Sequence, residues 1–331
     1  MEISDLGEFG LIKLLSTALE QKRGPQPELI IGIGDDAAAW RSTESTTLAT
    51  TDTLVEGIHF TSQCTWEEVG WKALAINLSD IAAMGGIPQY ALTALTLPMN
   101  MQAEDVVHLY EGMAKAARDF NVTIAGGNIS RAPTVTITVT LIGKAHKDGV
   151  LTRSTAKPRD MIAVTGYLGS SAAGQTMLRE NLLFDSATTA FLREAHTHPE
   201  PRLSEGQLLV TLGVQTAIDI SDGLISDMAH VCEESGVGAR LNTDELPIHS
   251  LVQSAFPNKA IGFALSGGED YELLFTAGRE TIARVKQQMR CPTTVIGEVT
   301  HSMPEKVMLV NREGKPVLRE QKGWDHFSRA S

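Results

Sequence analysis

The stretch TVTITVTLIGKA, residues 134–145, begins with a strict alternation of threonine and apolar side chains. Val135, Ile137, Val139 and Leu141 fall on one face of an extended chain, and the threonines fall on the other. A period of two is typical of a β-strand whose two faces meet different surroundings. The stretch therefore predicts a sheet with one apolar face and one polar face.

The sequence around this strand interleaves further strand patterns with helix patterns. Before it, we expect strands at 28–34, 46–52, 90–98 and 122–127, and helices at 8–19, 66–86 and 103–120. After it, we expect strands at 161–166, 216–220, 261–265, 271–276, 294–299 and 306–311, and helices at 169–180, 204–213, 223–235 and 279–290. Some connections are too short for parallel crossovers, so the sequence predicts mixed sheets in an α/β protein.

The segment KDGVLTRSTAKPRD, residues 147–160, is rich in glycine, proline and charge and is a candidate domain boundary. A chain of 331 residues is long enough for two ordinary domains. We therefore expect an N-terminal domain over 1–147 and a C-terminal domain over 148–331.

Composition and charge narrow the class of protein. The formal net charge of −12 argues against a general nucleic-acid binder, although a metal could screen the acids from a polyphosphate ligand. The three cysteines are far apart, which excludes a disulfide framework and a cysteine zinc site and is typical of a reducing cytoplasm. The first residues, MEISDLGEFG, lack the pattern of a signal peptide, and no apolar run approaches the roughly 20 residues that span a bilayer. We expect a cytoplasmic protein without a membrane segment.

Residues 30–40, IIGIGDDAAAW, match the dinucleotide fingerprint G-x-G-x-x-G/A. That fingerprint brings a pyrophosphate to a helix N-terminus, but Asp35 and Asp36 would repel the anion there. The residues that follow also lack the apolar period of a helix. We therefore reject a Rossmann site, and two alternatives remain. The two acids form an Asx turn, or a cation lies between them and a ligand.

Acidic side chains recur at the predicted ends of strands and in neighbouring turns. They are Asp35, Asp36, Asp52, Asp80, Asp219, Asp222, Glu269 and Asp270. Carboxylates that gather on one edge of a sheet repel each other unless cations bridge them. Oxygen ligands with no Cys or His nearby indicate Mg²⁺ rather than Zn²⁺. Because Mg²⁺ commonly shares its ligands with substrate phosphates, the pattern predicts a metal-bound polyphosphate.

Several of these residues also have a purely structural interpretation. Ser221 or Asp222 could cap the helix that follows, and His59 could be a partly buried histidine without a ligand. Their joint occurrence favours the metal site. The glycine-rich turns at 125–131 and 265–272 would allow a ligand to approach the backbone, and no P-loop motif is present. The candidate phosphate-binding cations are Arg131, Lys144 and Arg153.

Eight motifs occur in the order found in the thiamine-monophosphate kinase family. They are GIGDDAA, TTDTLVEGIHF, KALAINLSDIAAMGG, GGNISR, LTRS, IDISDGL, SGGEDYEL and GWDHF. The chain resembles this family from about residue 7 to Phe327. The wider superfamily includes aminoimidazole ribonucleotide (AIR) synthetase, selenophosphate synthetase and HypE. The resemblance implies a two-domain AIR-synthetase-like fold, in a homodimer whose N-terminal domains pair into a barrel between the subunits.

The resemblance also implies the reaction and the residues that serve it. The γ-phosphoryl group of ATP would pass directly to thiamine monophosphate, with several Mg²⁺ ions, in the last step of thiamine diphosphate biosynthesis. The implied metal ligands are Asp36, Thr50, Thr51, Asp52, Asp80, Asn128, Asp219 and Asp222. The implied ATP contacts are Tyr110, Gly127, Asn128, Arg153 and Ser221, and the implied substrate contacts are His59, Glu269 and Trp324. Because the attacking phosphate oxygen is already anionic, we predict no catalytic base and no phospho-enzyme.

One residue departs from the family pattern, and several rival functions share the fold. Asn128 stands where the family commonly has a metal-binding Asp, so one negative charge is lost there. The N-terminal segment lacks the reactive Cys expected of a selenophosphate synthetase, and the ending FSRAS lacks the terminal Cys of HypE. TTDTLVEGIHF and GWDHF favour the thiamine kinase over the purine synthetase. A non-catalytic Mg-nucleotide sensor is the alternative from another functional class.

Overall fold

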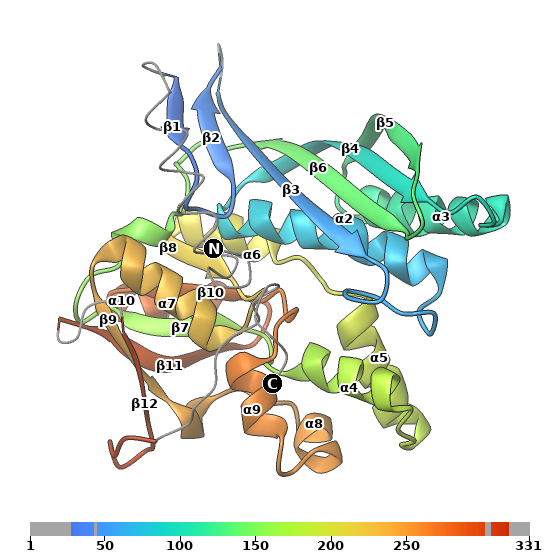
Figure 1. Cartoon of the computed structure of the whole chain (residues 1–331). Coiled ribbons are helices and arrows are strands. Elements are labelled where there is room, and N and C mark those ends of the chain that lie inside the picture. Colours follow the sequence, from blue (N-terminus) through green and yellow to red (C-terminus); the bar gives the residue numbers. More distant parts are fainter. Residues whose placement is uncertain (1–27, 43–44, 302–305, 318–331) are drawn as a thin grey trace, which may run out of the picture.

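Two six-stranded mixed sheets organise the part of the chain that the computed structural model describes, residues 28–42, 45–301 and 306–317 (Figure 1). The first sheet has the order β1-β2-β3-β6-β4-β5, and the second has the order β12-β9-β11-β7-β10-β8. The first comprises β1 (Leu29–Ile31), β2 (Ala38–Arg41), β3 (Thr46–Val55), β4 (Ile87–Leu97), β5 (Thr123–Arg131) and β6 (Thr136–Lys144). The second comprises β7 (Met161–Thr165), β8 (Thr216–Asp219), β9 (Gly238–Asn242), β10 (Leu273–Ala277), β11 (Thr293–Thr300) and β12 (Val307–Val310).

Helices connect the strands of both sheets. The α-helices in the described ranges are α2 (Trp66–Ala83), α3 (Ala103–Asp119), α4 (Ser170–Glu180), α5 (Ser186–Thr197), α6 (Leu203–Thr211), α7 (Leu224–Ser235), α8 (Ser250–Ala255), α9 (Ala260–Ser266) and α10 (Arg279–Gln288). Two short 3₁₀ helices are η1 (Arg153–Thr155) and η2 (Thr243–Glu245). Among these helices, none combines the length and apolar character that crossing a membrane requires.

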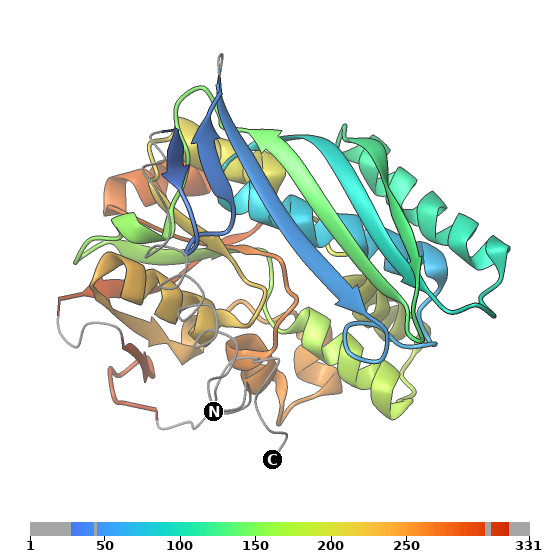
Figure 2. The same cartoon turned by 45° about the horizontal axis from the view of Figure 1, so that its top comes forward.

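The alternation in β6 gives the first sheet its two faces, as the sequence predicts. Val139 and Leu141 are fully buried on the face that α2 covers. On the opposite face Thr53 and Thr138 hydrogen-bond across the strands at 2.8 Å. Figure 2 shows this outer face, over which no helix of the described residues lies.

Helix α2 lies between the two sheets and carries residues of the site. It begins with a capping box, in which Thr65 Oγ1 accepts from the Glu68 N–H and Glu68 Oε2 accepts from the Thr65 N–H. It ends at Ala83 with Met84 as the C-cap, and Gly85 follows with a φ of +64°, in the left-handed region that favours glycine. The helix packs against β3 and β6 on one side and against α6 and β8 on the other (Figure 1). One helix therefore connects the first sheet to the second.

The residues after Asp36 form a strand rather than a helix. Strand β2 pairs antiparallel with β3, with Ala39 opposite Leu48. A Rossmann fingerprint leads directly into a helix, so this arrangement confirms the rejection of a dinucleotide site.

The strand expected at 261–265 is wrong, because these residues belong to helix α9. Ala260 and Ala264 are buried and one helical turn apart, whereas Ile261 is 36% exposed. This buried stripe packs against α4 and α7, and a short apolar run does not by itself distinguish a helix from a strand. No sequence pattern predicts β2, α5, α8 or β9, and the helix expected at 8–19 lies outside the described residues.

The first sheet is open within one chain. Its edges are β1 and β5, so the described residues close no barrel. The barrel between subunits and the division of the chain at 147/148 remain predictions.

Candidate active site

Three carboxylates from distant parts of the sequence meet beside α2. Asp36 lies in the turn before β2, Asp80 in the last turn of α2, and Asp219 at the end of β8. Each offers an oxygen, and the three oxygens lie within 4.8 Å of one another. We call Asp36, Asp80 and Asp219 the acid cluster.

Hydroxyl groups hold two members of the acid cluster in place. Thr50 Oγ1 donates a hydrogen bond to Asp80 Oδ2, and Ser79 Oγ donates to Asp219 Oδ2 at 2.6 Å. Ser79 immediately precedes Asp80 on α2. The helix therefore carries the Asp80 carboxylate itself and holds the Asp219 carboxylate through the Ser79 hydroxyl. The sequence analysis did not single out Ser79, because its partner is far away in sequence.

Strand β3 presents its residues alternately to the two faces of the sheet. Thr50 points toward the acid cluster, and Asp52 follows on the same face, where its N–H donates to Asn77 Oδ1 at 3.1 Å. The Thr51 side chain lies on the outer face and donates to the Val139 carbonyl at 3.1 Å. Two of the three β3 side chains implied as metal ligands therefore face the acid cluster, and the third does not.

Burial and mutual repulsion shift the pKa values of the acid cluster. Burial raises the pKa of Asp80 well above its usual range, and the charges of Asp52 and Asp219 raise it further. The pKa of Asp219 is also raised, first by burial and then by Asp36. Oδ2 of Asp36 is buried and finds no hydrogen-bond partner among the residues that the structure describes. An unpaired buried carboxylate oxygen is costly, and converging hard oxygen donors suit a divalent cation such as Mg²⁺.

Arg153 distinguishes the roles of the two neighbouring acids. Its Nη2 lies 2.6 Å from Asp36 Oδ1, so the guanidinium offsets part of the negative charge of the cluster. Asp35 instead holds the local backbone, because it accepts from the N–H groups of Arg153 at 3.2 Å and Asp36 at 3.0 Å. Burial, followed by the charge of Asp36, raises the pKa of Asp35 to about 7. Asp35 therefore fits the turn alternative, Asp36 belongs to the acid cluster, and a cation at Asp36 stays a prediction.

A further buried carboxylate shapes the loop after β8. Asp227 Oδ2 accepts from the N–H groups of Asp222 at 3.2 Å and Gly223 at 3.0 Å. Gly268 packs on the same loop, where an added Cβ would lie 2.3 Å from the Ser221 carbonyl oxygen. The sequence analysis missed Asp227, although an acid in the first turn of a helix is a recognisable signal for capping the preceding turn.

A second charged group surrounds Glu269, in the turn before β10. The Lys72 ammonium lies 2.7 Å from Glu269 Oε1 and donates to the His59 carbonyl at 3.3 Å. His196 Nδ1 lies 3.4 Å from Glu269 Oε2. Lys72 and Asp80 are eight residues apart on α2, which places the two groups roughly 12 Å apart along the helix. The structure thus brings together His59 and Glu269, two of the three implied substrate contacts, and Trp324 lies outside the described residues.

The remaining implied ATP contacts lie at the far edge of the first sheet. Tyr110 Oη and Thr93 Oγ1 are 2.9 Å apart, and Gly127 packs against the Thr93 backbone. Asn128 is exposed on β5, where its Nδ2 donates to Ser130 Oγ at 3.3 Å. Because β5 is three strands from β3, Gly127 and Asn128 lie roughly 14 Å from the strand that carries Asp52. One chain does not bring these residues to the acid cluster.

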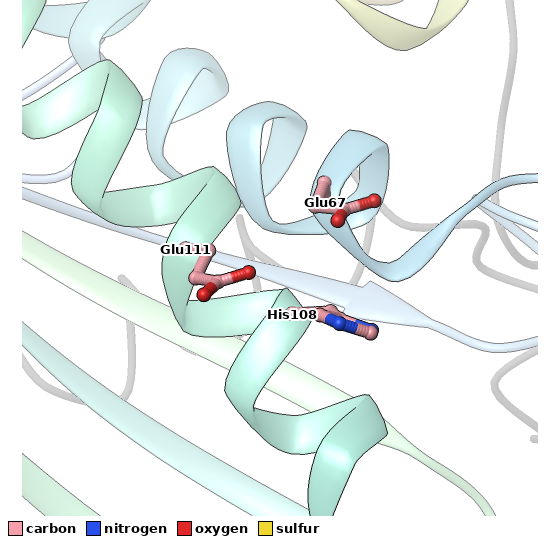
Figure 3. A group of neighbouring side chains, drawn as sticks. All are labelled: Glu67, His108 and Glu111. Carbon is pink, nitrogen blue, oxygen red and sulfur yellow. The ribbon is translucent and has the colours of Figure 1, made fainter.

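Another set of potential metal ligands lies on the surface. Figure 3 shows Glu67 on α2 beside His108 and Glu111 on α3, with one ligand atom from each within 4.8 Å of the others. Glu67 is 13 residues before Asp80, or roughly 20 Å along the helix. All three residues are exposed, where water solvates the charges, so we assign no site to them.

Comparison with known proteins connects this geometry to a family. Residues 34–145 match the model of the AIR synthase related protein N-terminal domain, and residues 157–310 match that of the C-terminal domain. The thiamine-monophosphate kinase of Bacillus subtilis (strain 168) is 39% identical over 305 residues, covering 90% of this chain and 93% of the relative. That of Escherichia coli (strain K12) is 38% identical over 328 residues, covering 97% and 98%. The chain belongs to the thiamine-monophosphate kinase family.

Solved structures agree with this membership. A complex of AaThiL with AMPPCP and TMP superposes with a TM-score of 0.87 at 33% identity, covering 98% of this chain and 99% of that chain. The thiamine-monophosphate kinase of Aquifex aeolicus gives a TM-score of 0.81 at 33% identity, covering 96% and 99%. HypE in complex with ATP gives a TM-score of 0.72 at 18% identity, over 98% of each chain, and shares the fold alone. The two-domain AIR-synthetase-like fold is therefore confirmed.

Proposed function

We propose that this member of the thiamine-monophosphate kinase family transfers the γ-phosphoryl group of ATP to thiamine monophosphate. The products are thiamine diphosphate and ADP, and the reaction completes thiamine diphosphate biosynthesis. The acid cluster carries the proposal, because its buried oxygens, one of them without a partner among the described residues, suit the cations that accompany a nucleotide triphosphate. Its relative AaThiL was solved with AMPPCP, a non-hydrolysable ATP analogue, and TMP.

The acid cluster would hold Mg²⁺, with further proposed ligands around it. Of these ligands, Thr50 and Asp52 face the cluster, and Asp222 follows Asp219 by three residues. Thr51 and Asn128 instead point away from the cluster of their own chain and would need a separate cation or a partner subunit. Bound Mg²⁺ would neutralise phosphate oxygens and orient the transferring group. Arg153 pairs with Asp36 of the acid cluster. If a cation binds Asp36, the Arg153 guanidinium could bind a phosphate instead.

The chain's own residues position the reactants and supply no covalent chemistry. The attacking oxygen belongs to the phosphate of thiamine monophosphate and is already anionic, so it needs no general base. Charge–charge repulsion between two phosphates is the main obstacle, and positioning with charge neutralisation removes it. Ser221 and Asp222 lie in the loop after β8, where the Ser221 carbonyl accepts from the Glu269 N–H and the Asp222 N–H donates to Asp227. We expect this loop to orient the phosphate of the substrate.

We also propose that the enzyme works as a homodimer in the cytoplasm. Tyr110, Gly127 and Asn128 lie too far from the acid cluster of their own chain to share its nucleotide, so a second subunit would have to supply them. The outer face of the first sheet supports this arrangement, because Leu92 is 43% exposed and Tyr90 51% exposed on it. Light scattering should give a dimer at micromolar concentration, and a monomer that retains full activity would contradict it.

The test of the function is ADP release with and without thiamine monophosphate, in the presence of Mg²⁺. We expect release to depend on thiamine monophosphate and to cease when EDTA removes the metal. A non-catalytic nucleotide sensor would bind MgATP and release no ADP under either condition. A kinase with another acceptor would show no increase on addition of thiamine monophosphate.

A further inference from the structure

Lys72 is a buried cation between two residues that the proposed function places at the substrate. Its side chain is 3% exposed, and its ammonium contacts the Glu269 carboxylate and the His59 carbonyl. We propose that Lys72 is a positioning residue that fixes Glu269 and the His59 turn for recognition of the heterocyclic end of thiamine monophosphate. This inference rests on the proposed function, since it concerns the same substrate.

The burial of Lys72 requires a partner, and Glu269 is that partner. An ammonium group removed from water costs several kcal/mol unless an opposite charge and hydrogen bonds compensate it. Burial alone would raise the pKa of the Glu269 carboxyl, but the Lys72 ammonium outweighs this effect and holds the pKa below its usual range. The two side chains therefore form an ionised pair.

His196 adds no second positive charge to this pair. Burial, reinforced by the Lys72 charge, lowers the pKa of His196 to about 3, so the imidazole is neutral at physiological pH. Its Nδ1 lies 3.2 Å from Ser171 Oγ and 3.4 Å from Glu269 Oε2. The group consequently contains one cation and one anion, and Glu269 carries no uncompensated charge toward a ligand.

The geometry leaves one oxygen of Glu269 for a ligand. The backbone of Glu269 has a φ of +66° and donates its N–H to the Ser221 carbonyl at 2.7 Å, so the residue is held at a fixed place. Lys72 holds Oε1 at 2.7 Å, whereas the contacts of Oε2 within the described residues are long, 3.4 Å each, to His196 and Gln175. Oε2 is therefore positioned to accept a hydrogen bond from an N–H donor, such as the amino group of an aminopyrimidine ring.

A hollow lies beside this oxygen. Its walls include His59, Phe60, Gln175, Leu178 and His196. The hollow is small, about 10 Å³, and polar side chains such as Gln175 and His196 line it beside apolar ones such as Leu178. The same ammonium that fixes Glu269 also holds the turn that provides His59 and Phe60, so Lys72 organises two walls of one site.

The experiment compares Lys72→Met, Lys72→Arg, Glu269→Gln and the double variant Lys72→Met/Glu269→Gln in the full-length enzyme. We expect Lys72→Met to raise KM for thiamine monophosphate about tenfold or more, with KM for ATP changed less than about twofold. Lys72→Arg, which keeps the charge, should recover part of the loss. If Lys72 acts through Glu269, the double variant should be no worse than the more damaged single variant.

Controls separate positioning from folding and from failure of the proposed function. Lys115→Met removes a lysine that lies 5.4 Å from the Trp71 ring on the neighbouring helix, and it should leave both KM values unchanged. If Lys72→Met does not fold, the double variant and Lys72→Arg replace it in the test. The double variant leaves no unpaired buried charge, and Lys72→Arg keeps the pair, so their KM values can still be compared with those of the unmodified enzyme. Equal rises in both KM values, no recovery by Arg, or additive losses in the double variant would overturn the proposal. Absence of substrate-dependent ADP release by the unmodified enzyme would instead overturn the proposed function.

Discussion

Replacing Asp80 with Asn should stabilise the protein without metal and remove much of its stabilisation by Mg²⁺. The oxygen of Asp80 lies within 4.8 Å of oxygens of Asp36 and Asp219. Two unit charges at that distance repel by about 3 kcal/mol when the effective dielectric constant is about 20. Asn keeps an oxygen that can accept the hydrogen bond from Thr50 Oγ1. The substitution therefore removes charge while retaining the local structure.

The net gain should be smaller than the sum of the pairwise repulsions. Burial raises the pKa of Asp80, and protonation of this carboxyl in the metal-free protein would relieve part of the repulsion. We expect the metal-free variant to gain about 1 to 3 kcal/mol in its free energy of unfolding. For a chain of 331 residues that corresponds to roughly 1 to 4 °C in Tm.

Thermal unfolding of both forms in EDTA and in excess Mg²⁺ measures the effect. The unmodified protein should gain stability on addition of Mg²⁺, because a ligand of the folded state alone stabilises it, and the variant should gain much less. Asp119→Asn, the same chemical change on the exposed end of α3, should change stability by no more than about 0.5 kcal/mol. A lower Tm of Asp80→Asn in EDTA, or an unchanged response to Mg²⁺, would refute the reasoning.

Three further outcomes are expected. Asp52→Asn should nearly abolish turnover without lowering Tm, because the residue serves bound metal rather than the core, and full activity at limiting Mg²⁺ would contradict this. His196 is neutral when folded and protonates on unfolding below its ordinary pKa of 6.5, so stability should fall with decreasing pH. Between pH 6.5 and 5, the free energy of unfolding of His196→Gln, measured by urea titration, should fall by about 2 kcal/mol less than that of the unmodified protein. An equal fall in both proteins would exclude protonation of His196 as the cause. Asn128→Asp should lower the Mg²⁺ concentration for half-maximal rate by about tenfold or less, roughly 1.4 kcal/mol, at saturating ATP with correction for MgATP formation. An unchanged or higher concentration would show that residue 128 meets no metal.

Local patterns predict the parts of the fold that depend on local forces. The sequence alternation predicts β6 correctly because successive residues of a strand point to opposite faces of the sheet. The capping residues before α2 and the glycines after it likewise predict where that helix begins and ends. Residues 261–265 show the limit of this reasoning. Their apolar run satisfies either periodicity, and the packing of α9 against α4 and α7 decides the conformation.

The site is predictable in its chemistry and less so in its arrangement. The acids at strand ends indicate a shared cation because repulsion among carboxylates follows from their type, and the structure gathers Asp36, Asp80 and Asp219. The roles of Lys72 and Asp227 depend on contacts formed only in the folded chain. Lys72 is separated from Glu269 by most of the sequence, and a lysine on a helix gives no sign of its partner. The separation of Asn128 from the acid cluster likewise follows from the strand order, which no local pattern specifies.

The central claim is direct phosphoryl transfer from ATP to thiamine monophosphate by this chain. The most direct measurement uses ATP that carries radioactive phosphorus in its γ-phosphate, incubated with the enzyme, Mg²⁺ and thiamine monophosphate. The account predicts that the label appears in thiamine diphosphate in an amount equal to the ADP formed, with none bound to the protein. Label in inorganic phosphate alone, or on a carboxylate of the chain, would contradict it.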